Sequence, residues 1–428
     1  MQERSVCSQS PIPAAVDGRR LWERHLAMAK IGRTERGGVN RQALTPEDAE
    51  GRNLLLSWAA QRNYAASIDP IGNLFIRRPG LDARAVPVMT GSHLDSQPTG
   101  GNFDGVFGVL AGLEVLETLD DSGLTTLRPI ELVVWMNEEG ARFPPTTMGS
   151  AVCAGELPLE TALATVDKEG ISVGDALAEH LRRIPPLTER ELGEDAFSYV
   201  EAHIEQGPVL EEKGCAIGIV TGIQGLNLFE VEVQGDEAHA GTTPLGNRRD
   251  AFVAASALAQ TLREIVHDPA DILRFTIGRF DVSPGSPNTV PGRVFFTIDL
   301  RHPDTAVLAR TGQRLLDACR RQDGPCSADA RLLFESRPVT FNDDILDVLR
   351  EAANDLGVPH IEMISGATHD AKFMVGQCPT AMIFVPCKDG ISHNEAESAR
   401  PDDLTAGAQL LCATIHRLAM AESALARN

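Results

Sequence analysis

Short apolar runs alternate with longer helical patterns from about residue 17 to residue 137. Residues 73–78 (NLFIRR) and 85–93 (AVPVMTGSH) have the composition of strands, and residues 130–137 (IELVVWMN) form an unbroken apolar run typical of an interior strand. Helices are predicted at residues 17–31, after the N-cap sequence Thr45-Pro46, and over the apolar residues 106–119. Strands that alternate with helices predict a layered α/β domain.

The pattern changes in the middle of the chain. Strand-like segments at residues 216–225, 226–235, 272–282, 292–301 and 330–336 are interrupted by helical segments at 250–266 and 304–321. This order, β-β-α-β-β-α-β, predicts a compact α+β module. From about residue 339 the α/β pattern resumes with a helix at 345–356 and a strand at 380–386. We therefore expect an α/β domain (1–216 and 336–428) that is interrupted by an inserted α+β domain (217–335).

Composition narrows the function classes. The net charge of −21 argues against a nucleic-acid partner or an anionic membrane, since phosphate contacts need basic patches. The eight cysteines, including Cys7, are scattered without a CxxC pair, so free thiols are expected. Residues 1–18 contain no apolar segment of a signal peptide, and no apolar run has the length of a membrane span. We expect a cytoplasmic protein that does not enter a membrane.

Histidines and acidic residues recur where the predicted strands end. His93 ends one strand and Asp104 follows in a glycine-rich loop, Glu138 and Glu139 follow residues 130–137, and His203 and His393 follow two further strands. Each alone has an ordinary explanation: a histidine at a strand end usually packs or faces solvent, and a Glu pair before glycine is a common turn. Together they predict one site at the carboxyl edge of the sheet.

These residue types suit a hydrolytic centre with two metal ions. Imidazole and carboxylate are ligands of Zn²⁺, and two close ions need a bridging carboxylate. Three histidines and two carboxylates give each ion three ligands if one carboxylate bridges. The pair Glu138-Glu139 then supplies one ligand and one general base. Asp95 is expected to accept the second imidazole N–H of His93 and so fix its tautomer.

Several motifs resemble the M20 metallopeptidase-related family, in its amidase, hydantoinase and carbamoylase branch. They are GSHLDSQPTGGNFDGVFGVLAGLE, NEEGARF, HIEQGPVLE, HAGTTPLGNRRDA, NTVPG with DLR, HDA and SHNEAE, in the family's order from about residue 20 to residue 420. The resemblance implies a phosphorylase/hydrolase-like α/β catalytic domain with a mixed central sheet. It also implies that the inserted α+β domain is a ferredoxin-like lid through which the protein forms a homodimer.

The resemblance also implies two divalent metal ions per subunit, Zn²⁺ or else Mn²⁺, Co²⁺ or Ni²⁺. His93, Asp104 and His203 would bind the first ion, and Asp104, Glu139 and His393 the second. Asp104 would thus bridge the two ions. A histidine at position 203, where peptidase relatives use a carboxylate, marks the amidohydrolase branch.

Catalytic and substrate roles follow from the same resemblance. Glu138 would be the general base, with Asp95 supporting the site, and His239 would polarise the scissile carbonyl. The remaining residues would contact the substrate: Gln206 its carbamoyl or amide end, and Asn288 and Arg301 its carboxylate. The segment with Gly366 and Thr368 would lie near the substrate, where Thr368 would narrow the pocket or add a hydroxyl contact. Outside this resemblance, Gln206 and Asn288 could be turn residues, His239 a surface histidine and Arg301 a surface ion pair.

The implied reaction is hydrolysis of the ureido group of N-carbamoyl-L-amino acids or N-carbamoyl-β-alanine to amino acid, CO₂ and ammonia. The motif SHLDSQP favours these substrates over allantoate, but Thr368 replaces a usual glycine and leaves allantoate open. An M20 dipeptidase or aminoacylase is a second alternative, which His203 disfavours. A non-catalytic metal- or ligand-binding relative is a third. A nucleotide-binding loop at residues 98–105 is disfavoured because it lacks the lysine of a Walker A motif.

Overall fold

The computed structural model describes residues 15–321, 324–422 and 425 of the chain. Contacts divide it into two units, Met1–Thr221 with Phe341–Asn428, and Gly222–Thr340. The units therefore change after residues 221 and 340, whereas the sequence pattern placed the changes after 216 and 335. Cys7 lies outside the described residues, and so do residues 1–14 of the segment in which no signal peptide was expected. The seven described cysteines are free thiols.

A large mixed sheet forms the centre of the first unit. Four neighbouring strands in the order β16-β6-β3-β4 are parallel, whereas β7 and β2 pair antiparallel on either side of them. The parallel strands are buried along their whole length, which explains the largely apolar sequences of the strands at residues 130–135 and 380–385. In the described residues the sheet has ten strands, namely β1 (Ala65–Ile68), β2 (Leu74–Arg78), β3 (Val88–His93), β4 (Ile130–Trp135), β5 (Thr188–Glu189), β6 (Ser198–Ile204), β7 (Ile217–Ile223), β14 (Val339–Thr340), β15 (His360–Ser365) and β16 (Thr380–Val385).

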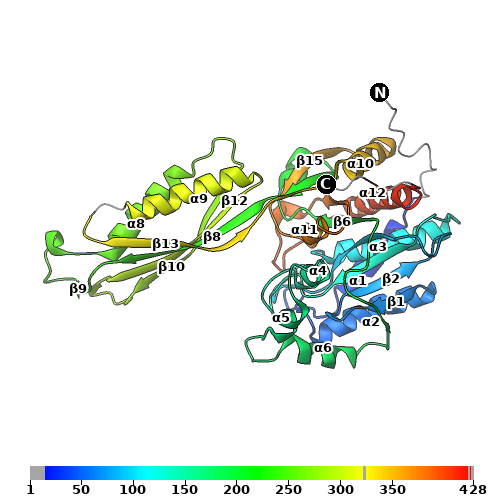
Figure 1. The fold of residues 1–428 in the computed structure, drawn as a ribbon, viewed down its shortest axis with the longest axis horizontal. Helices are drawn as coiled ribbons and strands as arrows, with labels where there is room; N and C mark the ends of the chain where they lie inside the picture. The colour runs from blue at the N-terminus through cyan, green and yellow to red at the C-terminus, as the bar shows by residue number, and fades with distance from the viewer. Residues whose placement is uncertain (1–14, 322–323, 423–424, 426–428) are drawn as a thin grey trace. The chain divides into compact units, whose positions relative to one another are not determined.

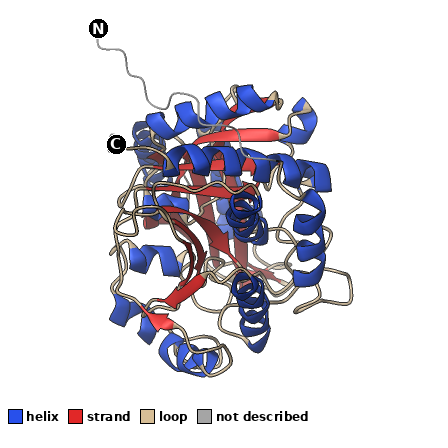
Figure 2. Ribbon diagram, turned by 90° about the vertical axis from the view of Figure 1, so that its right-hand side faces the viewer, coloured by secondary structure: helices blue, strands red, loops and turns tan. Residues whose placement is uncertain are grey.

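Helices pack around this sheet, as Figure 2 shows. The apolar α3 and α12 contact each other and the central strands β3 and β6, so both are largely buried. Thr45 caps α2 by accepting the Asp48 N–H, and Pro46 is its first residue, as the sequence predicts. The helices of this unit are α1 (Gly18–Met28), α2 (Pro46–Gln61), α3 (Val106–Asp121), α4 (Met148–Cys153), α5 (Leu159–Ala164), α6 (Val173–Leu181), α7 (Val209–Lys213), α10 (Asp343–Leu356), α11 (Ala371–Met374), η2 (Lys388–Gly390) and α12 (Pro401–Ala419).

The inserted unit has an antiparallel four-stranded sheet in the order β10-β12-β8-β13, with α8 and α9 packed on one face (Figure 1). Along the chain these elements follow the β-α-β-β-α-β order of a ferredoxin-like fold. Alternate residues of β8 and β12 are buried, as expected for a sheet covered on one face. The elements are β8 (Gly225–Gln234), β9 (Ala238–His239), η1 (Leu245–Asn247), α8 (Ala251–Ile265), β10 (Arg274–Ser283), β11 (Thr289–Val290), β12 (Arg293–His302), α9 (Thr305–Arg320) and β13 (Ser327–Ser336).

One predicted strand belongs to a different sheet from the one expected. Residues 216–225 were assigned to the inserted module, but β7 pairs antiparallel with β16 of the large sheet, with Val220 opposite Met382. The module therefore lacks the first strand of the predicted β-β-α-β-β-α-β order. The apolar pattern identified the strand correctly, but its partner lies more than 150 residues later in the chain.

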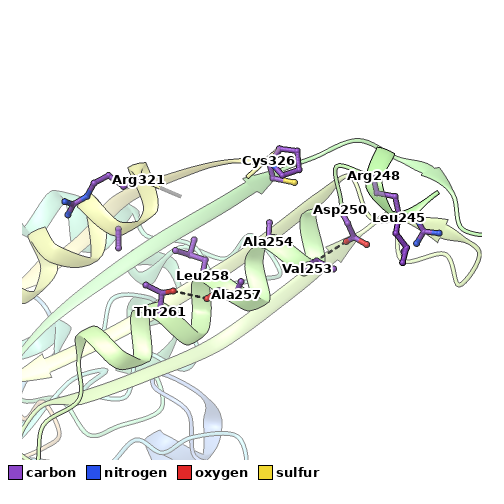
Figure 3. Close-up of a pocket in the computed structure, with 12 residues that line it drawn as sticks. Leu245, Arg248, Asp250, Val253, Ala254, Ala257, Leu258, Thr261, Arg321 and Cys326 are labelled. Atoms are coloured by element: carbon purple, nitrogen blue, oxygen red, sulfur yellow. Dashed lines mark hydrogen bonds between the residues drawn. The ribbon is translucent and has the colours of Figure 1, made fainter. Parts of the chain in front are cut away.

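The exposed side of α8 borders an apolar groove of about 720 Å³, drawn in Figure 3. Its walls include Val253, Ala257 and Leu258, and Arg248 and Arg321 contribute positive charge. The predicted site residues are not among those that line it. Among the residues that the structure describes, no helix is both long and apolar enough to span a membrane.

Candidate metal centre

The predicted ligands meet at one edge of the large sheet. Because β16, β6, β3 and β4 are neighbours and parallel, their carboxyl ends lie side by side. His93 is the last residue of β3 and His203 lies near the end of β6. Glu138 and Glu139 follow β4, and the loop after β16 carries His393. The sheet topology thus brings together residues that are far apart in the sequence.

His93, Asp104 and His203 form the first group of candidate ligands. Their ligand atoms lie within 4.8 Å of one another, and all three residues are buried. The Nε2 atoms of His93 and His203 lie 4.0 and 3.1 Å from Asp104 Oδ1. Each imidazole donates its Nδ1–H to a backbone carbonyl, at 2.9 Å for His93 and 2.8 Å for His203. A carbonyl can only accept, so in the neutral form of either ring Nε2 carries no proton and can bind a metal ion, whereas the protonated ring of His203 donates its Nε2–H to Asp104.

The second group consists of Asp104, Glu139 and His393. His393 Nε2 lies 3.2 Å from Asp104 Oδ2 and 3.3 Å from Glu139 Oε2. The side chain of His393 is half exposed, whereas the two carboxylates are buried. Gln97 holds Glu139 through its backbone N–H at 3.2 Å and its side-chain amide at 2.8 Å. Asp104 therefore presents one oxygen to each group, and this donor set of imidazoles and carboxylates fits divalent ions such as Zn²⁺.

The charges of the two groups are strongly coupled. Burial opposes ionisation of Asp104, but hydrogen bonds from His203 and His393 hold the pKa of its carboxyl well below the usual value. Burial lowers the pKa of His203, but the hydrogen bond and charge of Asp104 outweigh burial and raise it to about 9. The hydrogen bond to Asp104 raises the pKa of His393 to about 9 as well. Burial lowers the pKa of His93 to about 4.

Glu138 lies beside the first group but is not a member of the candidate ligand groups. Its Oε2 is 3.5 Å from His93 Nε2, and the residue is 8% exposed. Burial, followed by the charges of Asp370 and Glu139, raises the pKa of Glu138 well above its usual value. A carboxylate whose basicity is raised in this way, next to candidate ligands, has the properties of a general base.

Asp95 supports the site differently from the sequence prediction. His93 donates to the backbone oxygen of Asp95, and its Nδ1 lies 3.8 Å from the nearest carboxylate oxygen. The carboxylate instead accepts the backbone N–H groups of Glu138 and Glu139, each at 3.2 Å. The expected carboxylate–imidazole hydrogen bond is therefore wrong, because the chain turns after His93 so that a carbonyl reaches the ring first. Asp95 anchors the turn that carries the Glu pair.

Gly105 allows the loop after Asp104 to pass directly over His93. Its φ of +66° lies in the left-handed region, and an added Cβ would lie 2.3 Å from His93 Nε2. Any side chain at this position would collide with the candidate ligand atom. At position 105, at least, the glycine of this sequence is needed because the loop passes so close to His93.

Gln206, a predicted substrate residue, lies against the ligand groups. Its side-chain amide donates to Asp104 Oδ2 at 3.0 Å and to Ser392 Oγ at 3.2 Å. Its φ of +57° is unusual for a residue with a side chain. Gly366 and Thr368 lie in the loop between β15 and α11, the first exposed and the second half-buried. Their contact with substrate stays a prediction.

The other predicted substrate residues belong to the inserted unit. His239 is the last residue of β9 and lies opposite Thr289 of β11, and Asn288 directly precedes β11. The Nδ1 atom of His239 accepts the N–H groups of Gly241 and Thr242, so the neutral ring carries its proton on Nε2 as a donor. The guanidinium of Arg301 forms a bidentate pair with Asp299 at 2.8 and 2.9 Å. Their roles toward substrate stay predictions.

The sequence reading missed His369, which is buried against the first group. Its ring centroid lies 4.4 Å from that of His203, and it forms a further candidate ligand group with Glu201 and His203. The Glu201 carboxylate accepts the Ser92 hydroxyl and the Ala371 N–H, both at 2.8 Å. The motif HDA, already recognised beside Thr368, was the available signal for His369.

Comparisons with known proteins identify relatives of this chain. A model of peptidase family M20/M25/M40 matches residues 89–417. The N-carbamoyl-L-amino-acid amidohydrolase of Rhizobium meliloti is 43% identical over 401 residues, which cover 92% of this chain and 95% of that protein. The allantoate amidohydrolase of Escherichia coli (strain K12) is 35% identical over 396 residues, with coverages of 92% and 96%.

Among solved structures, an amidase of the hydantoinase/carbamoylase family from Burkholderia multivorans has a TM-score of 0.88 and 44% identity. The match covers 95% of this chain and 98% of that one. The family model, the full-length relatives and the solved structure agree with the family that the motifs resemble. The chain therefore belongs to peptidase family M20/M25/M40.

Proposed function

We propose that this protein is a binuclear-metal amidohydrolase that hydrolyses the carbamoyl C–N bond of N-carbamoyl amino acids. One observation carries the proposal: Asp104 presents its two oxygens to two ligand groups, and Glu138 lies beside them. The reaction consumes one water and converts R–NH–CO–NH₂ to amine, CO₂ and ammonia. N-Carbamoyl-L-amino acids and N-carbamoyl-β-alanine are the proposed substrates.

The proposed ligands divide into two sets that share Asp104. His93 and His203 complete the first, and Glu139 and His393 the second. Bound Zn²⁺, Mn²⁺, Co²⁺ or Ni²⁺ would polarise the substrate carbonyl and lower the pKa of water. The raised pKa of Glu138, caused first by burial, suits this residue to take a proton from the attacking water and pass it to the leaving nitrogen.

The proposed substrate contacts come from both units. Gln206 would bind the carbamoyl end, and the Nε2–H of His239 would stabilise negative charge on the carbonyl oxygen. Asn288 and Arg301 would hold the substrate carboxylate, for which the planar guanidinium is suited. In this proposal the inserted unit acts as a lid that excludes water when substrate is bound.

The substrate class rests on relatives and on the first motif. The Rhizobium meliloti relative is named for N-carbamoyl-L-amino acids, whereas the Escherichia coli relative is named for allantoate and keeps that substrate as the alternative. The test is an ammonia-release screen of N-carbamoyl-α-amino acids, N-carbamoyl-β-alanine, allantoate and a dipeptide panel. We expect N-carbamoyl amino acids to be cleaved fastest. Dipeptide cleavage without ammonia release would contradict the proposal.

Metal dependence is tested in the same assay. Chelation should abolish ammonia release, and Zn²⁺, Mn²⁺, Co²⁺ or Ni²⁺ should restore it. Undiminished turnover by protein shown to be metal-free would rule out the mechanism.

We further propose that two copies associate through the inserted unit. Leu245 and Val253 line the groove along α8 and expose 80% and 63% of their surface, and Phe252 of the same helix exposes 46%. A cluster of exposed large apolar side chains is typical of an interaction surface. Light scattering should give the mass of a dimer, and Val253→Glu should shift it toward the monomer. A monomeric wild type would contradict this part of the proposal.

A further inference from the structure

The loop that carries His393 contacts Asp104 at more points than a ligand role requires. Residues 392–397 have the sequence SHNEAE. His393 Nε2 and Ser392 Oγ lie 3.2 and 3.1 Å from the same Asp104 oxygen, Oδ2. At the other end of the loop, Glu397 Oε1 accepts the backbone N–H groups of Phe103 and Asp104 at 2.8 and 3.1 Å. The loop therefore fixes both the carboxylate of Asp104 and the backbone that carries it.

Glu397 is a buried carboxylate that is held by hydrogen bonds. It is 4% exposed, and within the described ranges no Lys or Arg forms an ion pair with it. An added Cβ on Gly101 would lie 2.0 Å from its Oε1, so the Asp104 loop approaches closely only because this residue is glycine. Burying such a group is unfavourable unless its oxygens are bonded. The two backbone N–H groups and the Ser392 hydroxyl supply these bonds.

Ser392 connects the two carboxylates. Its Oγ lies 3.0 Å from Glu397 Oε2 and 3.1 Å from Asp104 Oδ2. A hydroxyl has one proton, so it can donate to only one of these oxygens at a time. A glutamine at position 397 could accept the two backbone N–H groups with its oxygen and donate to Ser392 with its nitrogen. Position 397 therefore needs a side chain of this length with correctly placed hydrogen-bonding atoms, more than it needs a charge.

We propose that Glu397 is a positioning residue for Asp104. Through the backbone of residues 103–104 and through Ser392, it orients Asp104 so that each carboxylate oxygen faces one ligand group. This inference rests on the proposed metal centre. Glu397 touches neither substrate nor metal in this role, and its effect passes entirely through Asp104.

The test compares Glu397→Ala, Glu397→Asp and Glu397→Gln by metal titration of the metal-free protein. Alanine lacks the acceptor, and aspartate is one methylene too short to reach both partners. Both should weaken binding of the metal pair by about 10- to 100-fold. Both should also lose the spin coupling between two Mn²⁺ ions that is seen by electron paramagnetic resonance when a carboxylate bridges them. Glu397→Gln should keep both the tight binding of the metal pair and the spin coupling.

Asp268→Ala is the matched control. Asp268 also accepts backbone N–H groups, from Ala270, Ile272 and Leu273, but it lies in the inserted unit. This variant should bind metal like the wild type. Equal weakening by Asp268→Ala would overturn the inference, because the effect would then be general destabilisation.

The remaining outcomes separate this inference from the proposed function. A wild type that binds no metal pair refutes the proposed centre itself. If the wild type binds the metal pair and Glu397→Ala binds it equally tightly, only the role of Glu397 is refuted. If Glu397→Ala does not fold, the comparison of glutamine with aspartate decides. If Glu397→Asp kept tight binding of the metal pair and Glu397→Gln lost it, the inference would be overturned, since the charge of the side chain would then matter more than its length.

Discussion

Replacing Asp95 with asparagine should loosen the turn that carries Glu138 and Glu139. Asp95 is 3% exposed, and its two carboxylate oxygens each accept one of the two backbone N–H groups at 3.2 Å. Asparagine has the same shape but only one acceptor oxygen, so its NH₂ group would face one of the N–H donors. A buried N–H without an acceptor costs about 1–3 kcal/mol, and a lost hydrogen bond to a charged group costs a similar amount.

These two costs overlap, so we expect the free energy of unfolding to fall by about 2–3 kcal/mol. His93 should keep its orientation, because its Nδ1–H donates to the backbone oxygen of Asp95, which the substitution leaves in place. The group containing His93 and His203 should therefore still bind metal. The group containing Glu139 should bind about 10- to 100-fold more weakly, and kcat should fall on the order of 100-fold because Glu138 is displaced.

The assay combines metal titration, urea unfolding of the metal-free protein and ammonia release. Asp82→Asn is the matched control, since Asp82 accepts one backbone N–H, from Arg84, in an exposed turn. The reasoning would be refuted if Asp95→Asn lost the metal held by His93 and His203 first. That result would mean that the Asp95 carboxylate orients the imidazole after all. Unchanged metal binding and turnover would refute it as well.

Glu138→Gln should retain metal, because Glu138 is not a proposed ligand, but should lower kcat by about 100- to 10,000-fold since an amide cannot take the proton. Turnover near that of the wild type would exclude Glu138 as the base. Gly105→Ala should lower the free energy of unfolding by about 1–2 kcal/mol because of the left-handed backbone at this position alone. It should also displace His93, because an added Cβ would lie 2.3 Å from the His93 Nε2 atom. Elemental analysis should then find less bound metal, and full occupancy would contradict the geometry. Metal uptake should release protons, because the pKa values of His203 and His393 lie at about 9 in the metal-free protein, so both rings are protonated at pH 7. Glu139, whose pKa burial raises to about 8, should lose a proton as well, so calorimetry in buffers of different ionisation enthalpy should find about three protons released at pH 7, fewer as the pH rises through 9, and weaker metal binding as the pH falls below 9; release independent of pH would contradict these shifts.

The hydrophobic pattern predicted most elements and the positions of the candidate metal ligands at the ends of strands. The apolar run at 130–137 predicts an interior strand, and β4 (Ile130–Trp135) is buried at every position. His93, Glu139, His203 and His393 were each identified as residues that follow such strands, and the structure brings them together at one edge of the sheet. These predictions succeed because burial and period along a strand are local properties of the sequence.

The tertiary structure decided which strands pair and which atoms meet. Residues 216–225 have the pattern of a strand in either sheet, and only pairing with β16 assigns β7 to the large one. The sequence placed Asp95 near His93. In the fold, however, the Asp95 carbonyl accepts the imidazole N–H and its carboxylate accepts the backbone N–H groups of the Glu pair. Glu397 binds the N–H of Phe103 across a separation of 294 residues. Sequence periodicity reports how buried a residue is but not which distant group it meets, because side-chain contacts are fixed only when the whole sheet has assembled.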